Sequence, residues 1–185
     1  MNRSMQSAKA GLLILAAAFA ATIPWEPAAL AGRSVPTQAR MAEDHMSRAK
    51  VFLAAGDYRH ALQACELMIQ ERPSAAGYVY LTYVYQAIDG YLEHLAKTDQ
   101  WILVDQLYFN LAYRDPQDLV DPPGGMARMA KEMIQTSVRQ QADVSAAMAT
   151  RLDKSATEQL WQQQTAWRQS NPDRWWAGAP AGWDW

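Results

Sequence analysis

The stretch AKVFLAAGDYRHALQACELMIQERP, residues 49–73, predicts two helices joined by a tight turn. Gly56 and Asp57 interrupt a run of residues that otherwise favours helix, and Pro73 cannot continue a helix that reaches it. Two helices are therefore expected on either side of the turn, at about residues 36–55 and 58–71.

One face of the second helix is apolar. Ala61, Cys65 and Met68 fall at i, i+4 and i+7, so they lie on one side of a helix with 3.6 residues per turn. Cys65 is the single cysteine of the chain, which rules out an internal disulfide, and we interpret it as a small buried apolar side chain. Stability is therefore expected to come from packing.

The hairpin resembles the tetratricopeptide repeat, a helix-turn-helix unit of about 34 residues. The resemblance is clear over residues 41–73, although Cys65 stands where the family has a larger aromatic residue and Met68 where it has a small one. It implies that Ala61 lets the two helices approach closely. The positions that match the family pattern are Ala49, Phe52, Gly56, Tyr58, Ala61 and Pro73.

A partial second unit of the same family is expected over residues 74–91. The segment GYVYLTYVYQ, residues 77–86, alternates aromatic and aliphatic residues as a strand would, but it follows a helical hairpin and fits a third helix. This helix is predicted to open at Ser74 and to turn near Asp89 and Gly90.

Four tyrosines of this third helix are predicted to point to two faces. Tyr78 and Tyr85 fit the first-helix pattern of the repeat and are assigned to packing. First helices line the concave surface of such repeats, and a tyrosine there offers apolar area and a hydroxyl at low entropic cost. Tyr80 and Tyr83 are therefore predicted to lie on the surface and to bind a partner protein.

The rest of the chain reads as helix with one break. A fourth helix is expected at residues 101–113 and a long one at 126–151, which contains neither Gly nor Pro. Prolines and paired glycines prevent a helix from crossing residues 114–125. Ser155 and Glu158 have the capping-box spacing for a last helix.

These elements predict an all-α fold, arranged as a tetratricopeptide-like α-solenoid or a bundle with a Trp-rich tail. The expected divisions are a signal segment at 1–31, helical hairpins at 32–113, a Pro/Gly loop at 114–125, two helices at 126–169 and the tail at 170–185.

The amino terminus has the pattern of a secretory signal peptide. Arg3 and Lys9 precede an apolar run at residues 11–23, which is shorter than the roughly 20 residues that span a bilayer. Small residues follow, and cleavage is expected after Ala31. An uncleaved anchor helix is the alternative. We therefore expect an exported protein, periplasmic or secreted.

The charge argues against a nucleic-acid ligand. The full chain has 17 Lys and Arg against 19 Asp and Glu; without residues 1–31 it keeps 15 against 18, a formal net charge of −3. A polyanion requires a stripe of basic side chains, whereas the cations of this chain are scattered among acids.

Few residues suggest chemistry. Met126, Met129 and Met133 share one helix face, and exported thioether clusters can bind Cu(I), although methionines on a helix are more often core residues. The three histidines lack the spacing of a zinc helix, and no phosphate loop or nucleophile motif is present. We therefore expect no catalytic residues, no cofactor and no resident metal.

The tail NPDRWWAGAPAGWDW, residues 171–185, carries four tryptophans whose exposure to water would be unfavourable. They either cap the protein's own helices or anchor a partner protein, a membrane interface or a glycan ring. We expect Trp175 and Trp176 to dock on the chain's own helices, and Trp183 and Trp185 to bind a partner.

Three functions remain open on these observations. The leading hypothesis is an exported, non-catalytic helical-repeat adaptor that binds another protein, with membrane association through that partner or through the tail. The second is a structural small subunit or accessory factor of an exported enzyme or redox complex. The third is a copper-handling protein built on the methionines. No residue identifies the partner.

Overall fold

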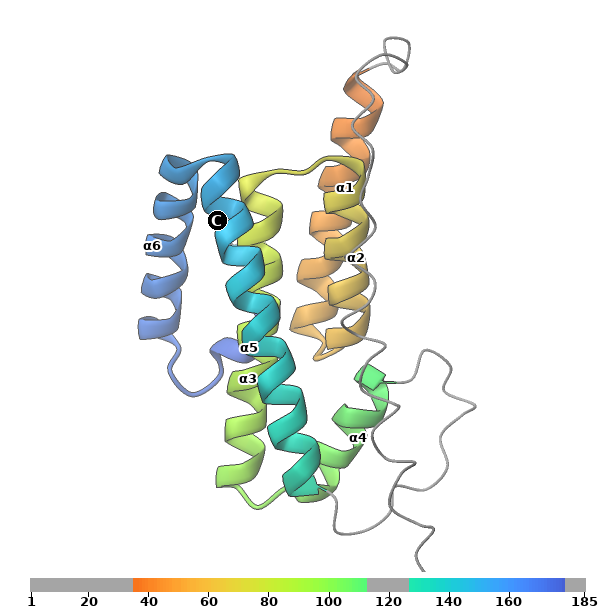
Figure 1. Ribbon diagram of the computed structural model, residues 1–185, viewed down its shortest axis with the longest axis vertical. Coiled ribbons are helices and arrows are strands. Elements are labelled where there is room, and N and C mark those ends of the chain that lie inside the picture. The colour runs from red at the N-terminus through yellow and green to blue at the C-terminus, as the bar shows by residue number, and fades with distance from the viewer. Residues whose placement is uncertain (1–34, 113–126, 179–185) are drawn as a thin grey trace, which may run out of the picture.

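The computed structural model describes residues 35–112 and 127–178, which are almost entirely helical (Figure 1). No strand occurs in these ranges, which confirms the all-α prediction. None of the helices in these ranges combines the length and the apolar composition that a membrane span requires. The elements are α1 (Val35–Ala54), α2 (Tyr58–Glu71), α3 (Ala75–Lys97), α4 (Trp101–Ala112), α5 (Ala127–Leu152), α6 (Lys154–Ser170) and the short 3-10 helix η4 (Trp175–Ala177).

The first hairpin forms at the turn that the sequence indicates. Gly56 has a φ of +76°, a conformation that side chains other than glycine rarely adopt. The backbone N–H of Asp57 donates to the carbonyl of Phe52 at 2.8 Å, and the Asp57 carboxylate accepts from the N–H of His60 and caps α2. Ala61 is fully buried between the helices.

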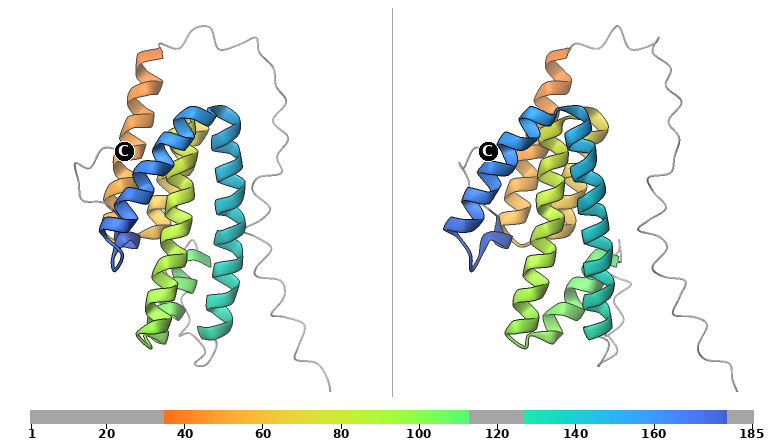
Figure 2. Two further views of the ribbon diagram at one scale, coloured as in Figure 1. Left: turned by 90° about the vertical axis from the view of Figure 1, so that its left-hand side faces the viewer. Right: turned by 60° about the vertical axis from the view of Figure 1, so that its left-hand side comes forward.

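Helix α3 is the centre of the fold. It contacts α2, α4, α5, α6 and η4, and the two views of Figure 2 show it between α5 and α6. Nearly every residue from Ala75 to Ile88 is buried, on all sides of the helix. An aliphatic and aromatic sequence with no polar face is what a helix surrounded by others requires.

The turn expected near Asp89 and Gly90 is absent, because α3 continues through both residues to Lys97. Gly90 serves close packing instead: a Cβ atom on it would lie 2.5 Å from the ring of Trp175. A single glycine weakens a helix by only about 1 kcal/mol relative to alanine, so packing on both sides of α3 can keep it helical. The prediction of a turn near Asp89 and Gly90, which would have completed a second repeat, was therefore wrong.

The cap of α6 also differs from the prediction. Asp153 is the N-cap, and its carboxylate accepts from the N–H of Ala156 at 3.0 Å. Ser155 therefore lies inside the first turn and does not open a capping box with Glu158. Asp153 directly follows the last residue of α5, Leu152, so α5 and α6 are joined by a single residue and form a sharp corner (Figure 1).

Candidate functional site

The four tyrosines of residues 78–85 in α3 do not form an exposed surface. Tyr80 and Tyr83, predicted to bind a partner, are only 3% and 0% exposed, so that prediction was wrong. Tyr78 and Tyr85, assigned to packing, are 9% and 8% exposed. The prediction failed because it assumed that one face of this part of α3 is open, whereas other helices and η4 cover the part that carries the four tyrosines.

Buried tyrosine hydroxyls hold the C-terminal segment of the described chain. The hydroxyl of Tyr83 donates to the carbonyl of Trp175 at 2.6 Å and accepts from the indole N–H of Trp167 at 3.1 Å. The hydroxyl of Tyr58 donates to the carbonyl of Trp176 at 3.2 Å. Burial raises the pKa of Tyr83 to about 12 and also raises the pKa of Tyr58, so Tyr58 and Tyr83 both act as neutral donors.

The rings of η4 pack on the same helices. Trp175 lies against Gly90, and the ring of Trp176 packs at a tilt against the imidazole of His94 with ring centroids 4.9 Å apart. These two tryptophans therefore dock on the protein's own helices, as the sequence predicted. Trp183 and Trp185 lie outside the described residues.

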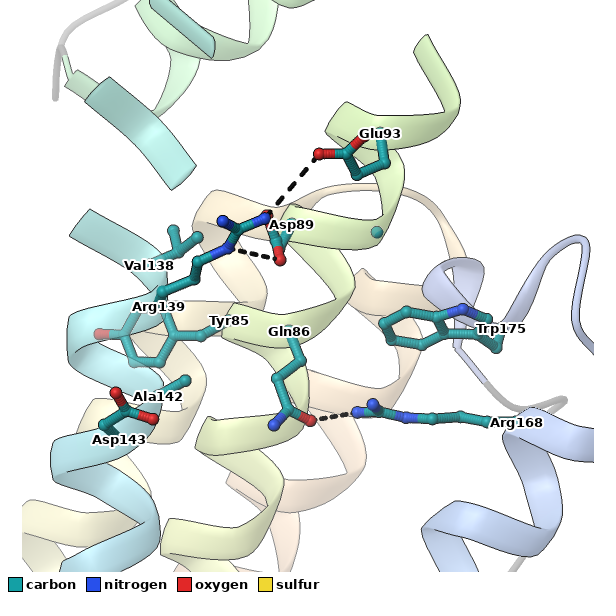
Figure 3. A pocket seen from close by; sticks show the side chains of 11 residues that line it. Tyr85, Gln86, Asp89, Glu93, Val138, Arg139, Ala142, Asp143, Arg168 and Trp175 are labelled. Carbon is teal, nitrogen blue, oxygen red and sulfur yellow. Dashed lines mark hydrogen bonds and ion pairs between the residues drawn. The ribbon is translucent and has the colours of Figure 1, made fainter. Parts of the chain in front are cut away.

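A cleft of about 430 Å³ lies over α3, with α5 on one side and α6 with η4 on the other (Figure 3). We call it the α3 cleft. Apolar side chains of α5 and the ring of Trp175 form parts of its walls. Its charged lining residues are Asp89, Glu93, Arg139, Asp143 and Arg168. Its size and mixed lining are within the range of ligand-binding clefts.

One end of the cleft is fixed by a polar network between α3 and α5. The side-chain amide of Gln135 donates to Asp89 at 2.7 Å and to Glu93 at 2.6 Å. Lys131 donates to Glu93 at 3.0 Å, and Arg139 donates to Asp89 at 3.0 Å. These hydrogen bonds, with Gln135 first and Lys131 second, lower the pKa of Glu93. The lowered pKa keeps Glu93 ionised, and both carboxylates already have donors within the network.

Arg168 is the cation of the opposite wall and has no such compensation. Its guanidinium carbon lies 4.2 Å from the ring centroid of Trp175 and 5.4 Å from that of Tyr83. One terminal nitrogen donates to Gln86, but Nε is buried without a partner. No carboxylate among the described residues pairs with it. Burial lowers the pKa of this guanidinium.

Asp143 is the second charge of the cleft without an ion pair among the described residues. It is exposed on α5, across the cleft from Arg168 on α6 (Figure 3). The cleft thus combines a compensated network at one end with two uncompensated charges of opposite sign on facing walls. Such an arrangement can orient a ligand but offers no nucleophile paired with a base.

The residues of this cleft were not predicted from the sequence. A usable signal was present, because Asp89 and Glu93 are four residues apart, as are Lys131, Gln135 and Arg139. Two helices with complementary polar rows can pair along those rows. Arg168 carried no comparable signal, since its position depends on where α6 packs.

The residues considered for metal binding are separated. His60 bonds to Asp57 at 2.6 Å and His45 to Glu71 at 3.3 Å, in different parts of the first hairpin. Met129 is exposed, and Met126 lies outside the described residues. Within the described ranges no three His, Cys, Asp or Glu side chains gather as metal ligands do. Cys65 is fully buried, and this burial raises the pKa of its thiol.

Comparisons with known proteins give no relative. No protein-family model matches the chain, and no curated protein or solved structure matches it.

Proposed function

We propose that this chain is an exported, non-catalytic adaptor that holds a segment of another protein in the α3 cleft. The observation that supports this most directly is Arg168, a half-buried cation that lines an open cleft without a carboxylate partner among the described residues. Desolvating a charge without a counter-charge is costly. A ligand that brings a negative charge to Arg168 would offset this desolvation cost.

The rigidity of the cleft also suits binding rather than reaction. Its α3 floor is held by contacts with α2, α4, α5, α6 and η4, and its α5 wall is fixed by the Asp89, Gln135 and Arg139 contacts. A preformed cleft loses little conformational entropy when a partner segment enters.

We further propose that α1 and α2 form one tetratricopeptide-like unit, on which the later helices build a bundle. The positive φ of Gly56, the complete burial of Ala49 and Ala61, and the end of α2 just before Pro73 support this proposal. No second unit is proposed, because α3 has no turn at Gly90.

Site-specific cross-linking in the native source tests the adaptor proposal. A photo-reactive residue replaces Ala147, which is exposed on α5 one turn beyond Asp143 and does not line the cleft. The matched control replaces Gln63, which is exposed on α2. We expect a discrete protein adduct from position 147 and none from position 63. Adducts of equal yield from both positions, or from position 63 alone, would contradict a partner at the α3 cleft.

A further inference from the structure

We propose that the α3 cleft recognises its partner through a single carboxylate, an acidic side chain of the partner that pairs with Arg168. This inference rests on the proposed adaptor function and names the chemistry of the same site. The guanidinium is held in place by the Trp175 ring, 4.2 Å away, and by Gln86, so it is oriented before the ligand arrives. A fixed guanidinium presents parallel N–H donors that match the two oxygens of a carboxylate.

The charges of the cleft favour one negative charge over several. Three carboxylates and two guanidinium groups line it, which gives a formal charge of −1. Asp89 and Glu93 are occupied by the α3–α5 network, but Asp143 is free to repel an approaching anion. Arg168 can neutralise one negative charge, so the second charge of a dianion such as phosphate would stay uncompensated beside Asp143 in partly desolvated surroundings. A carboxylate is therefore the better ligand.

The apolar walls suit the stem of such a side chain. Val138 and Ala142 of α5 line the cleft opposite the Trp175 ring. Methylene groups of a glutamate could lie between them while its carboxylate reaches Arg168. The desolvated surroundings strengthen the ion pair relative to one at an open surface.

A pair of small probes tests this directly on the full chain. The N-acetyl, C-amide derivatives of glutamate and glutamine have nearly the same shape and differ by one negative charge. Binding is followed by the NMR signals of the Arg168 Nε–H and the Trp175 indole N–H, with the Nε–H of Arg151, an exposed arginine of α5, as the control signal. We expect saturable shifts of both cleft signals with the glutamate probe alone.

Three variants should change the affinity for the glutamate probe in different ways. Arg168→Gln lowers affinity for the glutamate probe by about tenfold or more, since a charge-assisted bond is lost. Arg168→Lys retains weakened binding, because lysine keeps the charge but lacks the paired donors. Asp143→Asn raises affinity roughly twofold by removing repulsion across the cleft.

Several results would overturn the inference. They are equal shifts from both probes, a linear shift shared by Arg151, unchanged binding by Arg168→Gln, or tighter binding of inorganic phosphate than of the glutamate probe. The two proposals fail separately. A cross-link at position 147 with no response to the glutamate probe leaves the adaptor function and removes carboxylate recognition. Binding of the glutamate probe without a cross-link at position 147 leaves carboxylate recognition by the cleft and removes the adaptor function.

Discussion

At the scale of single residues, Gly90 shows how a residue that signals a turn can serve packing. Glycine next to Asp89 is a common turn signal, yet here the missing side chain makes room for the Trp175 ring, which comes from 85 positions further along the chain. No local pattern could reveal that requirement, because it is set by a tertiary contact.

Replacing Gly90 with alanine tests this role. Helix propensity alone would make the change favourable by about 1 kcal/mol, but the added methyl would lie 2.5 Å from the Trp175 ring. We expect overpacking to win and the free energy of unfolding to fall by about 1 to 3 kcal/mol in urea titrations. In a Trp175→Ala background the same change should be neutral or stabilising. An equal effect in both backgrounds would show that the ring is not the cause.

The raised pKa of Tyr83 predicts that the protein loses stability at alkaline pH. Its folded-state pKa of about 12 lies above the ordinary value of 10.0, so its contribution is complete below pH 10 and is lost as the pH rises toward 12. This one group should cost about 1 kcal/mol between pH 9 and pH 11. Urea midpoints should fall over that interval, and fall less for Tyr83→Phe. Identical pH profiles for the two proteins would refute the assignment.

At the scale of helices, much of the fold could be predicted, and the errors have a common origin. The expected ranges for α2 and α5 differ from the observed ones by no more than a residue or so at each end, because Pro73, the Asp57 cap and an unbroken run of helix formers act locally. The open face assumed for Tyr80 and Tyr83 depended on α6 and η4, which pack on α3 from far along the chain. The α3 cleft is a product of the same distant packing.

The α3–α5 contact should depend on Gln135 more than on its exposed neighbours. Gln135 is buried and donates to both Asp89 and Glu93. Gln135→Ala leaves two carboxylates with one fewer donor each, and we expect a loss of about 1 to 3 kcal/mol in the free energy of unfolding. Gln140→Ala, an exposed position on the same helix, should change it by less than about 0.5 kcal/mol. Equal effects would mean that the network contributes nothing beyond helix propensity.

At the scale of the whole molecule, the two ends of the chain are expected to have different roles. The amino-terminal segment expected to direct export lies outside the described residues. If this segment acts as a cleaved signal peptide, cleavage between Ala31 and Gly32 is expected because small residues precede that bond, and the mature protein then begins at Gly32. Intact mass measurement on protein from the native source should give the mass of residues 32–185. A mass that includes residues 1–31 would favour the anchor alternative.

The C-terminal segment is both a structural strap and, in our proposal, a binding element, and the boundary between the two roles falls near Gly178. Up to that residue the chain is tied to α3 and the first hairpin by Trp175, Trp176 and their carbonyls. Trp183 and Trp185 follow it and are assigned to the partner. The two roles therefore predict different results for two nested deletions.

Deleting residues 171–185 removes both docked indoles and leaves the Tyr58 and Tyr83 hydroxyls without their acceptors, so we expect a loss of several kcal/mol in the free energy of unfolding. Deleting residues 179–185 should change it by less than about 0.5 kcal/mol. The shorter deletion should nevertheless reduce the yield of the adduct from position 147, since interface tryptophans concentrate binding energy. Thermal melts and cross-linking on the same two proteins separate the roles. If the shorter deletion destabilises the fold as much as the longer one, Trp183 and Trp185 belong to the core and cannot be partner anchors.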